Sequence, residues 1–279
     1  MFALLMRIAS STVITLIMRF SDKKTSNNMA MFMANYAVCS LLSYFFMGGI
    51  PVFPNEPGSS FTLTIGAISG VWYLVGFLFM QWNMRENGVV LSSTFNRLGV
   101  IVPTIMAMVV FKESPKMVQI IGILVALVAI VLMQFEKDSA EAGGKKIWLV
   151  VMLLSAGFCD SLTNIYDKLG NPVLKDNYLL YTFFMALICA TILTIRAKKK
   201  ISKWDLFFGF IIGVPNYFSS WFMFEALKSV PAVIAYPVSS VGTILAISVG
   251  SVILFKEKIS NQKKFALVLV MAAMAMLNL

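Results

Sequence analysis

The sequence predicts an all-α integral membrane protein with ten transmembrane helices, arranged as two inverted five-helix repeats. The 279 residues are 59% hydrophobic and only 13% charged, whereas soluble domains carry about 25% charged residues. The hydrophobic residues are gathered in runs of about the 20 residues that a helix needs to cross a bilayer. A third observation, a long segment that occurs twice, divides these runs into two sets.

The duplicated segments are residues 89–133 and 233–278. Each is an apolar run with a Ser/Thr-rich start and a proline, then Phe-Lys-Glu, then a second apolar run. Phe111-Lys112-Glu113 returns 144 positions later as Phe255-Lys256-Glu257. Because a duplication of this size indicates two similar halves, we expect residues 1–136 and 147–279 to be the repeats and residues 137–146 to be a linker.

In the first half, polar or Pro/Gly-rich breaks delimit five apolar runs, since such residues end helices and form turns. Asp22-Lys23-Lys24 closes the first run, the segment 49–60 with its three prolines closes the second, and Arg85-Glu86-Asn87-Gly88 closes the third. The first Phe-Lys-Glu closes the fourth. The predicted helices are 3–20, 29–48, 61–83, 89–111 and 117–135.

The second half repeats this pattern after the polar linker. A basic cluster at 196–203 separates the seventh run from the eighth. The predicted helices are 147–165, 178–195, 206–227, 233–255 and 264–279. Two halves of five spans joined by a short linker must cross the bilayer in opposite directions, which is the inverted repeat of many secondary transporters.

The distribution of Lys and Arg predicts the orientation. The odd-numbered loops carry 16 of these residues and the even-numbered loops 5. The positive-inside rule therefore places the odd-numbered loops in the cytoplasm and both termini outside. We expect a multi-pass protein of the cell (plasma) membrane.

The net charge of +10 follows from these loop lysines beside anionic lipid, so we expect the lipid bilayer and no nucleic acid as a partner. The chain has no histidine, and its three cysteines fall inside apolar runs. Zinc binding and Ser-His-Asp or Cys-His catalysis are therefore unsupported. We expect no metal, no cofactor and no enzymatic activity.

The chain resembles the EamA-type ten-helix transporters of the drug/metabolite transporter (DMT) superfamily. The resemblance rests on the two Phe-Lys-Glu tripeptides, together with Pro103, Gly122 and Pro237. It implies secondary transport of a small metabolite or drug-like solute, often efflux, through a cavity walled by helices one, three, four, six, eight and nine. Many members are assigned cytoplasmic termini, which is the reverse of the lysine count here.

Arg97 is the sharpest candidate for substrate binding. It lies near the middle of the predicted fourth helix, where a charge is costly and so marks a functional hypothesis. Its planar guanidinium suits a carboxylate or phosphate. The alternative is a structural ion pair with Asp160 or Glu225. Asp160 is itself a candidate, because a buried aspartate favours its neutral form and could bind a proton during transport.

Further candidates are polar and aromatic residues in the spans. The Ser/Thr-rich starts of the fourth and ninth helices could line a cavity, and Pro237 removes a backbone donor near the second one. The alternative is that each hydroxyl bonds its own helix or a close neighbour. The remaining substrate-binding candidates are Trp72, Tyr73, Ser93, Asn96, Asn164, Asn216, Tyr217, Tyr236, Ser239 and Ser240.

Three functions compete at this stage. The first is a secondary transporter that works by alternating access through a central cavity, with a small-molecule substrate and with proton or ion coupling left open. The second is a channel or facilitator, and the third is an intramembrane enzyme, which the absence of histidine and of paired acids disfavours. We expect a monomer, because ten spans suffice to enclose a cavity.

Overall fold

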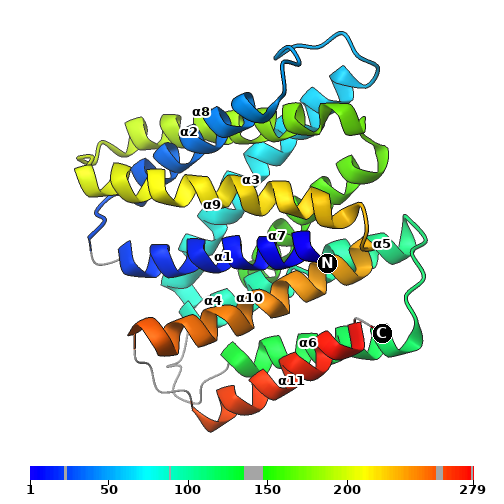
Figure 1. Ribbon diagram of the computed structural model, residues 1–279. Coiled ribbons are helices and arrows are strands. Elements are labelled where there is room, and N and C mark those ends of the chain that lie inside the picture. The colour runs from blue at the N-terminus through cyan, green and yellow to red at the C-terminus, as the bar shows by residue number, and fades with distance from the viewer. Residues whose placement is uncertain (22–23, 88, 135–146, 256–259, 278) are drawn as a thin grey trace.

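The computed structural model describes the chain except residues 22–23, 88, 135–146, 256–259 and 278 (Figure 1). The described residues form eleven α-helices and one short 3-10 helix, η1. Their bounds are α1 Phe2–Ser21, α2 Asn28–Phe46, α3 Ser59–Asn87, α4 Val89–Leu98, α5 Ile101–Val109, α6 Met117–Gln134, α7 Ile147–Leu169, η1 Pro172–Leu174, α8 Lys175–Ala197, α9 Lys203–Leu227, α10 Ala232–Phe255 and α11 Asn261–Leu277.

The helices have the lengths and composition of membrane spans. Seven helices in the described part of the chain are long and apolar enough to cross a bilayer. Two shorter apolar helical stretches cover residues 95–109, which include the turn between α4 and α5, and residues 117–132. The prediction of an all-helical membrane protein therefore agrees with the structure. The N- and C-terminal ends lie toward the same end of the bundle (Figure 1).

The predicted fourth helix is two helices, α4 and α5, and here the sequence prediction was wrong. Pro103 has no N–H to donate to the carbonyl of Gly99, and its ring crowds that carbonyl. The chain between the helices instead uses shorter bonds, from Val100 N to Arg97 O (3.4 Å) and from Val102 N to Gly99 O (3.0 Å). Pro237, by contrast, lies inside α10 without breaking it. The break therefore occurs in one half only, directly after Arg97.

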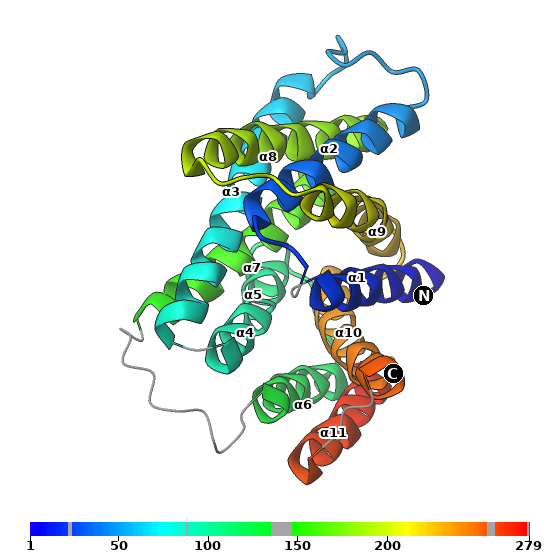
Figure 2. The same ribbon diagram turned by 90° about the vertical axis from the view of Figure 1, so that its left-hand side faces the viewer.

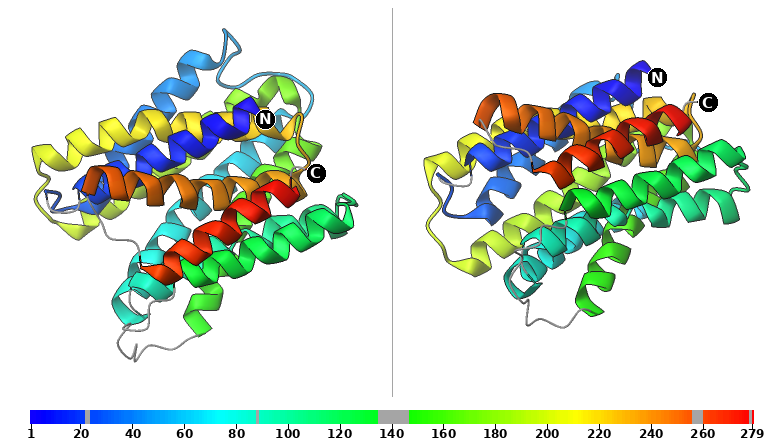
Figure 3. Two further views of the ribbon diagram at one scale, coloured as in Figure 1. Left: turned by 60° about the horizontal axis from the view of Figure 1, so that its bottom comes forward. Right: turned by 90° about the horizontal axis from the view of Figure 1, so that it is seen from below.

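The helix contacts come in matching pairs when the first five spans are exchanged for the last five. The contact of α2 with α9 matches that of α8 with α3, and the contact of α1 with α9 matches that of α7 with α3. The contact of α1 with α10 matches that of α7 with α4 and α5. α2 packs on α8 and α6 on α11. Figures 1 and 2 show α2 with α8 at one edge of the bundle and α6 with α11 at the opposite edge, and Figure 3 shows α11 lying beside α6.

Close glycine contacts hold two of these matching interfaces. A Cβ at Gly70 of α3 would collide with the carbonyl oxygen of Thr182 on α8. A Cβ at Gly209 of α9 would collide in the same way with the carbonyl oxygen of Met31 on α2. Each glycine has a second one four residues away, Gly66 and Gly213. Small residues at this spacing let membrane helices approach closely, so α3 and α9 each place one face against a neighbour and leave another for the interior.

Candidate substrate cavity

A polar chamber of about 180 Å³ lies among α1, α4, α7 and α10. Two arginines and one aspartate are the charged side chains among the residues that line it. Hydroxyl and amide groups supply most of the remaining lining. The lining residues are Arg7, Ser11, Asn96, Arg97, Val100, Ala156, Asp160, Tyr236, Ser239, Ser240 and Thr243.

Arg7 of α1 is held in this chamber by α9 and α10. Its Nε donates to Ser239 Oγ at 2.8 Å, and its Nη1 donates to the carbonyl oxygen of Ser219 at 3.0 Å. Ser11, one turn further along α1, is 2.8 Å from the hydroxyl of Ser219. A guanidinium has five N–H groups, so Arg7 keeps donors for a ligand. Arg7 was not among the residues predicted to bind substrate, although a charge inside an apolar run is the signal that indicates such a site.

Arg97 also lines the chamber, from the last turn of α4. Neither a hydrogen bond nor an ion pair joins its guanidinium to any residue that the structure describes. The predicted alternative, an ion pair with Asp160 or Glu225, is therefore not formed. Glu225 instead pairs with Lys175 at 2.5 Å and with Lys228 at 2.9 Å, because it lies at the end of α9, where both lysines can reach it.

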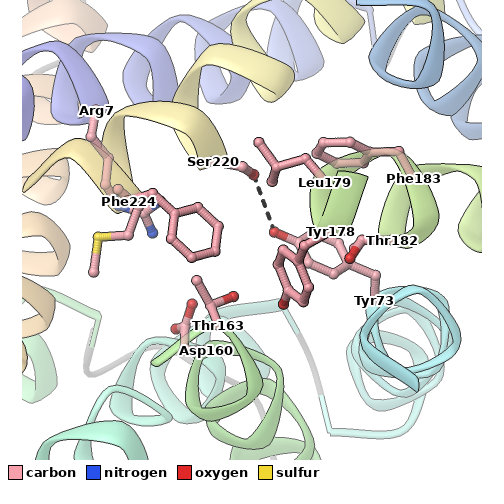
Figure 4. Close-up of a pocket in the computed structure, with 11 residues that line it drawn as sticks. Arg7, Tyr73, Asp160, Thr163, Tyr178, Leu179, Thr182, Phe183, Ser220 and Phe224 are labelled. Carbon is pink, nitrogen blue, oxygen red and sulfur yellow. Dashed lines mark hydrogen bonds between the residues drawn. The ribbon is translucent and has the colours of Figure 1, made fainter. Parts of the chain in front are cut away.

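Asp160 of α7 stands where the chambers meet, since it lines the polar chamber and two neighbouring hollows. In Figure 4, Asp160 and Arg7 approach the same space from opposite helices. The hydroxyl of Tyr236 donates to the backbone carbonyl of Asp160 at 2.8 Å, which fixes α10 against α7. The backbone is thus held by α10, while the carboxylate faces the cavity.

A second chamber of about 280 Å³ adjoins the first; it is mostly apolar, and we call it the aromatic chamber because four aromatic side chains line it. The two share Asn96, Ala156 and Asp160. Trp72 is held edge-on by Phe158, with ring centroids 5.0 Å apart. The hydroxyl of Tyr73 is 3.4 Å from that of Ser220 (Figure 4). The chamber is lined by Ile14, Met18, Phe32, Asn35, Tyr36, Trp72, Tyr73, Gly76, Met80, Asn96, Ala156, Cys159, Asp160, Ile212 and Asn216.

Nine of the twelve residues predicted from the sequence line one or both chambers. In the polar chamber these are Arg97, Asn96, Asp160, Tyr236, Ser239 and Ser240, and in the aromatic chamber Trp72, Tyr73 and Asn216, again with Asn96 and Asp160. Asn216 also donates from Nδ2 to Asn35 Oδ1 at 3.1 Å, which joins α9 to α2. The side chain of Ser93 lies outside the described part of the structure.

Asn164 and Tyr217 lie in the packed interior and line neither chamber. Both side chains are fully buried. Tyr217 packs against Phe46 and Phe183, at ring-centroid distances of 5.5 and 6.5 Å. The helical position alone placed these residues inside the bundle, but only the packing of neighbouring helices decides which interior residues reach a cavity.

Glu113 ties the two halves together at one end of the bundle. Its Oε2 accepts a hydrogen bond from the backbone N–H of Val233, in the first turn of α10, at 2.9 Å. Its Oε1 lies 2.9 Å from Lys168 Nζ, near the end of α7. An acidic side chain at a helix N-terminus satisfies an unpaired donor and the helix dipole. Its counterpart Glu257 lies outside the described residues.

Comparison with known proteins agrees with this arrangement. Residues 147–279 match the model of the EamA-like transporter family. The second half of the chain is therefore similar to the domains of that transporter family. An uncharacterized protein of Haemophilus influenzae is 21% identical over 274 residues, which are 92% of this chain and 91% of that protein.

A solved crystal structure shares the fold of almost the whole chain. It superimposes with a TM-score of 0.77 at 12% identity and covers 99% of this chain and 94% of its own. This likeness concerns the fold, and the similarity to the EamA-like transporter family concerns residues 147–279. The EamA-like family is a family of transporters. Among the described residues, no three His, Cys, Asp or Glu side chains gather as a metal site would require.

Proposed function

We propose that the protein is a secondary transporter that moves a small solute through the central cavity by alternating access. The observation that carries the proposal is the composition of the cavity wall. Both predicted halves contribute to it, residues 1–136 through α1 and α4, and residues 147–279 through α7 and α10. A solute bound there contacts both halves, so a rocking motion of one half against the other could expose it to either side.

Contacts between the halves at both ends of the bundle support this mechanism. At one end, Glu113 binds α7 and α10. At the other end, Asp205 in the first turn of α9 accepts hydrogen bonds from the backbone N–H groups of Ser26 (2.9 Å) and Asn27 (3.3 Å). The connection between α5 and α6, which carries Glu113, and the start of α9, which carries Asp205, lie at opposite ends of the bundle (Figure 1). Alternating access requires separate closures of this kind at each side of the site.

Counterflow in liposomes tests the transport function. Purified protein is reconstituted, the vesicles are loaded with a mixed panel of organic acids, amino acids and amines, and uptake of labelled members of the panel is measured. Saturable uptake that is accelerated by the same solute inside supports a transporter. Ion current that does not saturate indicates a channel and would refute the proposal.

A cavity-filling variant tests whether the solute passes through this cavity. Ala156 lines both chambers, so Ala156→Trp should abolish counterflow. Ala9 is an exposed residue on α1, and Ala9→Trp should leave counterflow intact while adding the same side chain. Equal activity of the two variants would show that solute does not pass through this cavity.

The orientation and the assembly belong to the same proposal. The ten spans form an inverted repeat in the cell membrane, with the odd-numbered loops cytoplasmic and the protein monomeric. The matched helix contacts support the repeat, and the lysine distribution supports the orientation. A reporter fused after Leu279 should lie outside the cytoplasm, and a cytoplasmic reporter would reverse the assignment.

A further inference from the structure

We propose that the substrate is a small organic monoanion that carries an aromatic ring, with its anionic group at Arg7 and Arg97 and its ring among Tyr36, Trp72 and Tyr73. This inference rests on the transport function proposed above and names the class of solute. Three features carry it: the charge of the cavity, the free donors of Arg97, and the adjoining aromatic chamber.

The lining of the cavity has a surplus of one positive charge. Arg7 and Arg97 are cations, and Asp160 is the one acid among the described residues that line the two chambers. Buried charges inside a membrane protein are costly unless they are compensated. A monoanion brings the cavity to neutrality, a zwitterion leaves the surplus unchanged, and an amine increases it. A protonated Asp160 would enlarge the surplus, so the preference for an anion holds in either state.

Arg97 is a hydrogen-bond donor that the described side chains leave unused. Arg7 is oriented by Ser239 and Ser219 and still has N–H groups to offer. Arg97 makes no hydrogen bond or ion pair within the described chain and faces the same chamber. A planar guanidinium binds a carboxylate through two parallel hydrogen bonds. Two such groups around one chamber therefore favour an oxyanion over a neutral or cationic group.

The aromatic chamber defines the other end of the ligand. It shares Asn96, Ala156 and Asp160 with the polar chamber, so one ligand could reach both. The indole of Trp72 and the ring of Tyr73 are held in place by Phe158 and Ser220. Fixed aromatic side chains bind a ligand ring by stacked or edge-to-face contacts, which are favourable beyond simple burial. Ligand pockets commonly combine such an apolar wall with a few convergent polar groups.

Four probes with one phenyl body and different charges test the inference. They are 3-phenylpropionate (anion), L-phenylalanine (zwitterion), 2-phenylethylamine (cation) and 3-phenylpropionamide (neutral). Binding to the purified protein at neutral pH is measured by calorimetry. The anion should bind about 10-fold to 100-fold tighter than each of the others, because a hydrogen-bonded buried charge contributes about that factor.

Substitution of Arg97 should change the selectivity and not only the affinity. Arg97→Gln removes the surplus charge, so 3-phenylpropionamide should then bind at least as tightly as 3-phenylpropionate. This gain cannot come from a misfolded protein. Arg97→Lys keeps the charge and should keep the preference for the anion, with weaker binding. Arg196 is an exposed arginine at the end of α8, and Arg196→Gln should bind all four probes as the wild type does.

Three results would overturn the inference: binding of phenylalanine or phenylethylamine as tightly as the anion, an unchanged preference in Arg97→Gln, or no binding of any probe to the wild type. The transport proposal is judged separately. Saturable counterflow of phenylalanine without counterflow of phenylpropionate would leave that proposal standing and refute this one.

Discussion

Replacing Glu113 by alanine should destabilise the protein far more than removing its ion-pair partner Lys168. Glu113 accepts a hydrogen bond from the backbone N–H of Val233, a buried residue at the start of α10. Leaving this N–H without an acceptor costs about 1–3 kcal/mol. The favourable interaction with the helix dipole adds about 0.3–1 kcal/mol. The ion pair itself contributes little, because the Lys168 side chain is 35% exposed and such pairs are worth about 0–1 kcal/mol.

The expected order of destabilisation is therefore Glu113→Ala, at about 1–4 kcal/mol by combining these contributions, then Glu113→Gln, then Lys168→Ala at under about 1 kcal/mol. Glutamine retains an oxygen for the Val233 N–H but loses the charge. Equilibrium unfolding of the purified protein in mixed micelles, followed by tryptophan fluorescence, gives the three values. If Lys168→Ala proved as damaging as Glu113→Ala, the contact with the start of α10 would not be the stabilising element.

Three further predictions concern packing, helix ends and the cavity. Gly70→Ala should lower the stability of the protein by about 1–3 kcal/mol through overpacking against α8, whereas Gly76→Ala, where an added Cβ meets nothing within 4 Å, should not; equal unfolding midpoints would contradict the close contact. Asp205→Ala should cost about 1–3 kcal/mol because three backbone donors, of Ser26, Asn27 and Ser202, lose their acceptor, and Asp205→Asn should recover part of it in the same unfolding assay. Cys159 lines the aromatic chamber and Cys189 does not. A bound solute should therefore slow the labelling of Cys159 by a maleimide, measured by mass spectrometry, without slowing that of Cys189. Equal slowing at both cysteines would argue against binding in the chamber.

The sequence anticipated most of the helices because the signal is local. A span is a run of apolar residues whose length is set by the thickness of the bilayer, and its ends are marked by loop residues such as the lysines of 196–203. Arg97 and Asp160 could be selected for the same reason, since a charge within an apolar run is visible without knowledge of its neighbours. The break between α4 and α5 was not predicted, because a proline in the sequence does not by itself show whether its helix is interrupted. Pro237 lies inside α10 without breaking it.

Only the tertiary structure decided which residues from distant parts of the chain contact one another. Arg7 lies 232 positions from Ser239 and Glu113 lies 120 positions from Val233, and no periodicity in the chain records such contacts. They arise from the way in which the helices of the two halves pack, which close approaches at Gly70 and Gly209 help to set. The apolar composition of each segment by itself thus determines that it can span a membrane. The charged cavity forms only when segments that are distant in the sequence pack together.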